Sequence, residues 1–250
     1  MRQRPETPAE LFEVMQFSPI DWPWKTTRMR RDSVQNVRQR PGSSQAAIGE
    51  LYHQNSTLFP ACLDDLAASW LDPDAVRLEF LRRRASGVRP NAYADGARFS
   101  LARPLLDQVV RSGPAQLFYA IELRLSDDSG LVRYEPLAGR LEALRFFSGQ
   151  EAEPLREALD PFGPPGPQPA ERLFILASFP RNEVLYGARG YRRTLVEVGR
   201  VVQAVVDEAR RREVVVRVSL EFHDRVVDAF IGADGVEEAA LAVVELGERT

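Results

Sequence analysis

Apolar residues recur at steps of three and four between residues 190 and 212, a spacing that predicts one long amphipathic helix. The stripe expected to face the core consists of Leu195, Val198, Val202, Val205, Val206 and Ala209. Val196 and Val201 add apolar side chains to it, so the helix is hydrophobic nearly all round. We therefore expect the helix to pack on a sheet and a second surface, such as a partner subunit, to cover the rest.

The period changes to two in residues 117–125, where alternate apolar side chains predict a strand. SDDSG (126–130) predicts a turn, and LVRYEP (131–136) predicts the returning strand of a hairpin. RLFILASF (172–179) is a continuous apolar run, typical of a strand covered on both faces, and 241–247 is expected to be the final strand.

Residues 48–87 have mainly helical spacing, and the proline-glycine segment 160–169 predicts a connector. Residues 214–222 are expected to form a strand and 223–232 a short helix. This order of elements indicates an α+β sandwich with a mixed central sheet and a long core helix. We expect a single domain over residues 48–250.

Residues 1–47 differ from the rest, with a basic cluster, Gly, Ser and Pro, and little periodicity. We interpret them as an N-terminal arm or extension, partly irregular, which is either loosely ordered or a crossing loop. The alternative is an arm that embraces a dimer partner or docks a peptide, with Trp22 and Trp24 as anchors.

The 250 residues are 44% hydrophobic and 28% charged, with a net charge of −3. This composition is typical of a globular protein and gives no case for nucleic acid or an anionic membrane as partner. The single cysteine, Cys62, excludes an internal disulfide and favours a reducing, cytoplasmic compartment. We expect no membrane span and no secretory signal. Lys25 is the only lysine.

Five segments occur in a recognisable order: LYHQNSTLF, AYADGARFSLARPL, RSGPAQLFYAIEL, SGLVRYEPLAGRLEAL and YGARGYRRTLVEVGRVVQAV. Together they make the chain resemble, over residues 50–247, the SagB-type dehydrogenases of the nitroreductase-like flavoproteins. The last segment, which opens the long helix, is the most specific. The resemblance implies a shortened nitroreductase-like domain that dimerises and binds FMN between subunits.

The resemblance further implies a role in ribosomal peptide natural-product biosynthesis, where azoline rings are oxidised to thiazole or oxazole. A flavin accepts two electrons as hydride while a base removes the ring α-proton. The implied partners are a modified precursor peptide and a second subunit. That subunit would be another copy of the chain, a complete dehydrogenase or a cyclodehydratase complex.

The family grips the flavin phosphate with an arginine-rich stretch. In one alignment this stretch survives as RRRASGVR, with Arg84, Ser86 and Arg89 as cofactor-binding residues. In the other, which we favour, it is deleted, because AYADGARFSLARPL follows RRRASGVR here instead of preceding the stretch. RRRASGVR is then a solvated helix end.

Two further departures concern the site. The family's lysine-tyrosine pair is Leu185-Tyr186 here, which leaves Tyr186 as the candidate catalytic residue. After the long helix, Glu213 is followed by two valines where the family has a glycine. Arg189, Arg192 and Arg193 at the helix start form a candidate anion site, and Arg189 and Arg192 are the candidates for cofactor binding. Pairing of these arginines with Glu183 or Glu197 is the alternative, and we favour it.

His53 and His223 are far apart in sequence and have no cluster of ligands around them, so we expect no metal site. Two hypotheses remain. The chain is a degenerate subunit that supports or pairs with an FMN-dependent azoline dehydrogenase, with doubtful FMN binding of its own. Alternatively, it is itself an active FMN-dependent oxidoreductase that converts peptide azolines to azoles.

Overall fold

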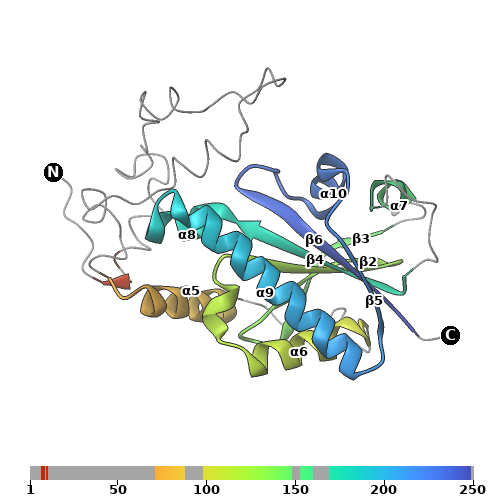
Figure 1. Cartoon of the computed structure of the whole chain (residues 1–250), viewed down its shortest axis with the longest axis horizontal. Coiled ribbons are helices and arrows are strands. Elements are labelled where there is room, and N and C mark those ends of the chain that lie inside the picture. The colour runs from red at the N-terminus through yellow and green to blue at the C-terminus, as the bar shows by residue number, and fades with distance from the viewer. Residues whose placement is uncertain are drawn as a thin grey trace, which may run out of the picture. The chain divides into compact units, whose positions relative to one another are not determined.

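The computed structural model describes residues 7, 8, 10, 71–87, 98–147, 153–159 and 169–248 (Figure 1). The chain divides into two compact units. Unit one comprises Met1–Glu79 and Pro180–Arg193, and unit two comprises Phe80–Phe179 and Thr194–Thr250. Cys62, His53, Arg89 and nearly all of the N-terminal arm lie outside the described residues. The extent of a single domain over 48–250 therefore stays a prediction.

Unit two is built around a six-stranded sheet with the order β3-β2-β1-β4-β6-β5. Its strands are β1 (Ile121–Asp127), β2 (Gly130–Glu135), β3 (Arg140–Phe146), β4 (Glu171–Ser178), β5 (Val215–Ser219) and β6 (Glu238–Gly247). Every residue of β4 is buried, as expected for a central strand covered on both faces.

The sheet is antiparallel at all five described pairings, which corrects the expectation of a mixed sheet. Strands β4 and β5 run in the same direction, as a helical crossover between them requires. However, β6 lies between them and pairs antiparallel with both. The two parallel strands are thus never neighbours, and sequence order alone did not reveal this insertion.

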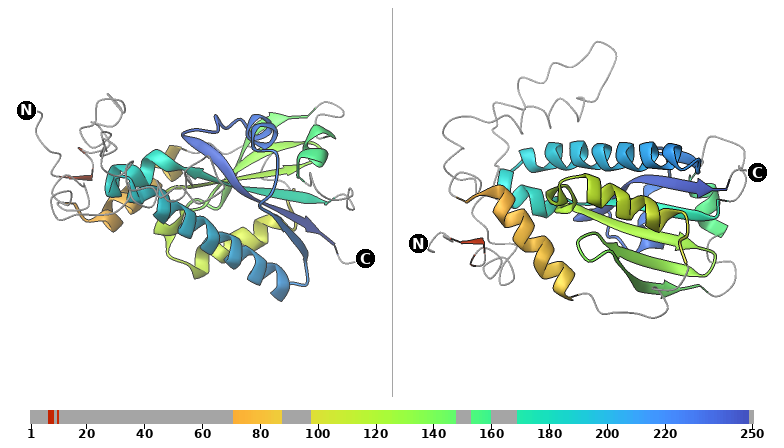
Figure 2. Two further views of the ribbon diagram at one scale, coloured as in Figure 1. Left: turned by 45° about the horizontal axis from the view of Figure 1, so that its top comes forward. Right: turned by 90° about the horizontal axis from the view of Figure 1, so that it is seen from below.

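Helices cover both faces of the sheet (Figure 2). On one face, α6 (Ala102–Ser112) and α9 (Arg189–Arg211) contribute to a core shared with β1, β4 and β6. On the other face, α7 (Glu153–Leu159) and α10 (Asp224–Ile231) form a second, smaller core. The remaining described helices are α5 (Pro73–Gly87), the 3-10 helix η3 (Ala115–Phe118) and α8 (Phe179–Tyr186). The α+β sandwich and the long core helix are confirmed.

The long helix buries a stripe that differs from the predicted one at two positions. Val201, which the predicted stripe did not include, is fully buried, whereas Val205 is buried as predicted. Leu195, a member of the predicted stripe, is 41% exposed, and Val196, outside that stripe, is 63% exposed. The helix is therefore amphipathic, and the expectation that it is apolar nearly all round is wrong. Its outward apolar surface is confined to the first half of the helix.

The predicted hairpin is confirmed for β1 and β2, with two differences. Residues 115–118 form η3, so β1 begins at Ile121 and not at residue 117. A third strand, β3, extends the hairpin into a meander. The sequence analysis missed β3 because RLEALRF has no strict alternation, and Leu144 sits at a bulge in the pairing with β2.

Candidate functional site

The turn between α8 and α9 in unit one carries the family-like YGARGY segment. Gly187 ends α8 with φ of 56°, and its N–H donates to the carbonyl of Glu183 at 2.7 Å. Gly190 lies so close to α8 that a Cβ there would be 2.4 Å from the backbone carbon of Asn182. Both glycines are thus required by local geometry: one by its left-handed backbone, the other by the close approach of two helices.

This turn sets the position of Tyr186, the predicted catalytic residue, at the end of α8. The guanidinium carbon of Arg193 lies 4.6 Å from the centroid of the Tyr186 ring, and that of Arg77 lies 5.4 Å away. Arg77 is 2% exposed, and its Nη2 donates to Oδ1 of the fully buried Asn182 at 2.9 Å. Tyr186 is half-buried. A phenol flanked by two cations can donate a hydrogen bond to a ligand.

Arg189 and Arg192, the predicted anion-binding pair, stand in the first turn of the 23-residue helix α9. Arg189 is exposed and Arg192 is half-buried. The positive end of a helix dipole and nearby guanidinium groups favour an anion. The structure thus gathers Tyr186, Arg189, Arg192 and Arg193 at one turn, as the sequence analysis expected. Arg77, which the sequence analysis did not assign to the site, contacts the same turn.

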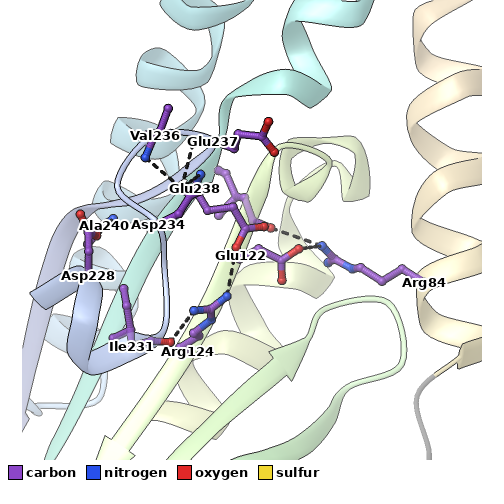
Figure 3. Close-up of polar contacts among 11 residues, drawn as sticks. Arg84, Glu122, Arg124, Asp228, Ile231, Asp234, Val236, Glu237, Glu238 and Ala240 are labelled. Atoms are coloured by element: carbon purple, nitrogen blue, oxygen red, sulfur yellow. Dashed lines mark hydrogen bonds and ion pairs between the residues drawn. The ribbon is translucent and has the colours of Figure 1, made fainter. Parts of the chain in front are cut away.

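Arg84 occupies a different environment, inside unit two (Figure 3). Its side chain is 9% exposed, and its Nη1 donates to Oε1 of Glu122 at 2.9 Å. Its Nε lies 2.5 Å from Oε2 of Glu135. Burial raises the pKa of Glu135 above its ordinary value, against the lowering effect of the Arg84 charge. The Arg84 guanidinium is therefore committed to two buried carboxylates.

The other residues of the RRRASGVR segment add little to a phosphate site. Ser86 is exposed, and its hydroxyl donates to the carbonyl of Arg83 at 2.8 Å, within helix α5. Because a phosphate would have to displace Glu122 and Glu135 from Arg84, the described residues fit an FMN phosphate only in part. Among the described residues, the start of α9 can contact a phosphate, but the arginine-rich stretch that the resemblance implies is not available to it.

Leu185, at the position of the family lysine, is completely buried. The side chain at this position therefore points into the protein. Glu213 lies at the C-terminal end of α9 and has a φ of 56°. The N–H of the next residue, Val214, donates to the carbonyl of Ala209 at 2.9 Å. These features define a Schellman motif, in which glycine is the favoured residue at the position of Glu213. The glycine that the family has in this region would therefore fit the left-handed backbone conformation at this position.

A second polar cluster surrounds the loop between α10 and β6 (Figure 3). Oδ1 of Asp234 accepts the N–H groups of Val236, Glu237 and Glu238 at 2.8–3.0 Å. Arg124 donates to the carbonyl of Ile231 and to Glu238, so it joins β1 to both ends of the loop. These contacts stabilise the loop, and they explain its polar side chains without a ligand.

The described part of the chain contains no group of three or more His, Cys, Asp or Glu residues placed to hold a metal ion. None of its helices is both long and apolar enough to cross a membrane.

The sequence matches no protein-family model and no curated protein. Solved structures do match. One, from Anabaena variabilis and described as a nitroreductase, has a TM-score of 0.57 at 16% identity. The match covers 80% of this chain and 46% of that one, so this chain spans less than half of its length. 

A second match is a chain of the E. coli microcin synthetase McbBCD complex with truncated pro-MccB17 bound. It has a TM-score of 0.53 at 17% identity and covers 99% of this chain and 95% of that one. Identities this low establish the fold and not the activity. Together with the antiparallel sheet sandwiched between α6, α9 and α7, α10, they show that the chain has the nitroreductase-like fold.

Proposed function

We propose that this chain is a SagB-type dehydrogenase-like subunit of a machinery that makes thiazoles or oxazoles in ribosomal peptides. In this proposal it supports or pairs with an FMN-dependent azoline dehydrogenase and is not the complete enzyme. Its partners are the modified precursor peptide and either a complete dehydrogenase or a cyclodehydratase complex. A second copy of the chain is the other candidate partner.

The likeness to the microcin synthetase chain supports the peptide setting, because it extends over nearly the full length of both chains. That structure is of a multi-subunit complex with a peptide bound. The order of the family-like segments in this sequence points in the same direction, since the most specific of them builds the Tyr186 turn.

The observation that carries the supporting role is the state of Arg84. Its guanidinium contacts Glu122 and Glu135 in a buried ion-pair cluster, so it is unavailable to a phosphate without breaking that cluster. Loss of two charge-assisted hydrogen bonds, each contributing roughly 1.5–3 kcal/mol, would weaken FMN binding by about two to four powers of ten. Leu185 in addition supplies no group that takes a proton.

The alternative is an active FMN-dependent oxidoreductase, and the Tyr186 turn favours it. In that case Arg189 and Arg192 hold the phosphate at the start of α9, and Tyr186 donates a hydrogen bond near the reacting ring. A bound FMN would supply the hydride acceptor. The residues of this chain would then bind, orient and donate hydrogen bonds.

The test measures FMN binding and turnover with the purified full chain. We expect weak quenching of flavin fluorescence and no azole formation from an azoline peptide at saturating FMN. Adding a complete dehydrogenase from the same gene neighbourhood should raise azole formation above the rate of that enzyme alone. Robust turnover by the chain alone would contradict the supporting role and establish the alternative.

Matched variants locate the cofactor if binding is found. Arg189→Met and Arg192→Met should weaken FMN binding, whereas Arg200→Met, which removes an exposed arginine further along α9, should not. Equal effects of all three would indicate nonspecific attraction by positive charge. In that case the start of α9 would not be the phosphate site.

A further inference from the structure

Arg77 contacts two residues of α8 at once. Its Nη2 donates to Oδ1 of Asn182, and its guanidinium carbon lies over the ring of Tyr186. Asn182 and Tyr186 are four residues apart on one helix, so they lie on the same face, one turn from each other. A single guanidinium from helix α5 therefore contacts both a hydrogen-bond acceptor and an aromatic ring on the same face of α8.

We propose that Arg77 is a positioning residue, which fixes the orientation of the Tyr186 ring at the candidate site. The proposal goes beyond the proposed function, because it holds for a supporting subunit and for an active enzyme alike. It rests on the proposed function only in treating Tyr186 as the group that the site presents to its ligand. Nothing in the sequence pattern singled out Arg77.

Arginine suits this role because its planar guanidinium donates in its own plane while its face stacks on an aromatic ring. Lysine carries the same charge, but its ammonium is a point donor that cannot stack. Arg77 is buried, so the position of its guanidinium is set by surrounding atoms and not by solvent. An exchange of Arg77 for lysine therefore separates the geometry of the contact from its charge.

Arg193 completes the arrangement. Its guanidinium lies 4.6 Å from the ring centroid, which is stacking distance, so it covers a face of Tyr186. A ligand that approaches this covered face cannot stack on the ring. The hydroxyl is then the group through which Tyr186 contacts a ligand, and the direction of that hydroxyl follows from the ring orientation that Arg77 sets.

The experiment uses the full chain labelled with 3-fluorotyrosine, whose ¹⁹F resonances report the surroundings of each ring. The chain has six tyrosines, and the resonance of Tyr186 is assigned by its loss in Tyr186→Phe. We expect Arg77→Lys and Arg77→Met both to displace the Tyr186 resonance while the other resonances stay in place. Arg200→Met, an exposed change on α9, should displace none.

Two outcomes overturn the proposal. One is a Tyr186 resonance that keeps its wild-type position in Arg77→Lys. The other is a joint movement of all resonances, which indicates a general loss of packing. If the Arg77 variants do not fold, Asn182→Ala provides the test, because it removes the acceptor and keeps the buried charge. An unmoved Tyr186 resonance in that folded variant also overturns the proposal.

A binding assay connects the geometry to the site once FMN or an azoline peptide is shown to bind. Arg77→Lys and Tyr186→Phe should then weaken binding by similar factors, and the double variant should be no weaker than Tyr186→Phe alone. Additive losses contradict positioning through Tyr186. A chain that binds neither ligand refutes the FMN alternative, whereas the ¹⁹F result still decides the role of Arg77.

Discussion

The carboxylate of Asp228 accepts the backbone N–H of Ala240 at 2.8 Å, so a side chain of α10 bonds to β6 beyond the point where β5 ends. Asp228 is buried, and this desolvation, with Asp224 and Asp234 nearby, raises the pKa of its carboxyl. The pKa of the Asp234 carboxyl is instead lowered, because it accepts hydrogen bonds from backbone N–H groups, with that of Glu238 contributing most.

The two aspartates should therefore respond in opposite ways to replacement by asparagine. Because the pKa of Asp228 is raised in the folded state, its protonated form favours folding and its ionised form opposes folding. The stabilisation is present below pH 3.8 and is lost as the pH rises through the folded-state pKa. We expect Asp228→Asn, which retains an acceptor for Ala240, to be at least as stable as the wild type at pH 7. The advantage should disappear at pH 3. Chemical unfolding of the variant and of the wild type at both pH values tests this expectation.

For Asp234 the lowered pKa means that stability is present above pH 3.8 and is lost as pH falls through the folded-state value. Asp234→Asn should accordingly lower the unfolding midpoint at pH 7 and match the wild type in acid. If both variants change stability in the same direction at pH 7, the electrostatic explanation of this loop is wrong.

The Arg84 cluster predicts unequal effects of removing a cation and removing a carboxylate. Arg84→Met leaves two buried carboxylates without their cation and should cost about 3–5 kcal/mol in the free energy of unfolding. Glu135→Gln leaves one arginine with one glutamate, and because burial raises the pKa of Glu135, the loss of that charge should cost far less at pH 7. Urea unfolding of both variants tests the difference, and equal losses would contradict it.

Two glycines of α9 offer a matched pair for the Tyr186 turn. A Cβ at Gly190 would overlap backbone atoms of Asn182 and Glu183, whereas a Cβ at Gly199 has no atom within 4 Å. Gly199→Ala should stabilise the helix by about 0.5–1 kcal/mol, since alanine is the better helix former. Gly190→Ala should be clearly destabilising and should disturb the ¹⁹F resonance of Tyr186. A harmless Gly190→Ala would mean that the helices do not approach as closely as described.

Glu213 occupies a left-handed position that glycine adopts without strain. Glu213→Gly should therefore raise the free energy of unfolding by up to about 1 kcal/mol, the scale of the steric cost of this conformation. Glu213→Ala serves as the control, because it removes the carboxylate and keeps the Cβ. An equal gain in both variants would assign the effect to charge and not to the backbone.

The outward face of α9 predicts association. Leu195 and Val196 are adjacent and exposed, a patch that a second copy or a partner subunit could cover. Light scattering at micromolar concentration should show a dimer of the chain or of the chain with its partner. Val196→Glu should shift it toward the monomer, whereas Val236→Glu, at the exposed α10–β6 loop, should not. A monomer under all conditions would contradict the proposed pairing.

The sequence predicted those parts of the fold that depend on local periodicity. The spacing of valines identified α9, and the apolar run before Phe179 identified β4. It failed where a contact between distant segments decides the outcome. The burial of Val201 in place of Leu195 depends on where the sheet lies, and the antiparallel order depends on the insertion of β6.

The same distinction applies to the site. Tyr186, Arg189 and Arg192 could be predicted as site residues because they belong to one continuous motif, and their role in a site stays a prediction. Arg77 was missed because it acts on α8 from a position 105 residues earlier in the chain. Arg84 was interpreted either as a phosphate ligand or as part of a solvated helix end, and its burial contradicts the second reading. Its partners, Glu122 and Glu135, stand on strands that the arginine spacing cannot reveal. A motif shows which residue types are present, but only the fold shows which charges they meet.

The place of β6 between β4 and β5 also has a consequence for synthesis on the ribosome. A strand made earlier, β5, has no edge to join until residues 238–247 have emerged, because β6 is the one strand it pairs with among those that the structure describes. Until then the nascent chain exposes β4 as an apolar edge beside the finished meander. We therefore expect the described sheet to be completed only once β6 is available, and aggregation through the β4 edge to be favoured before that point.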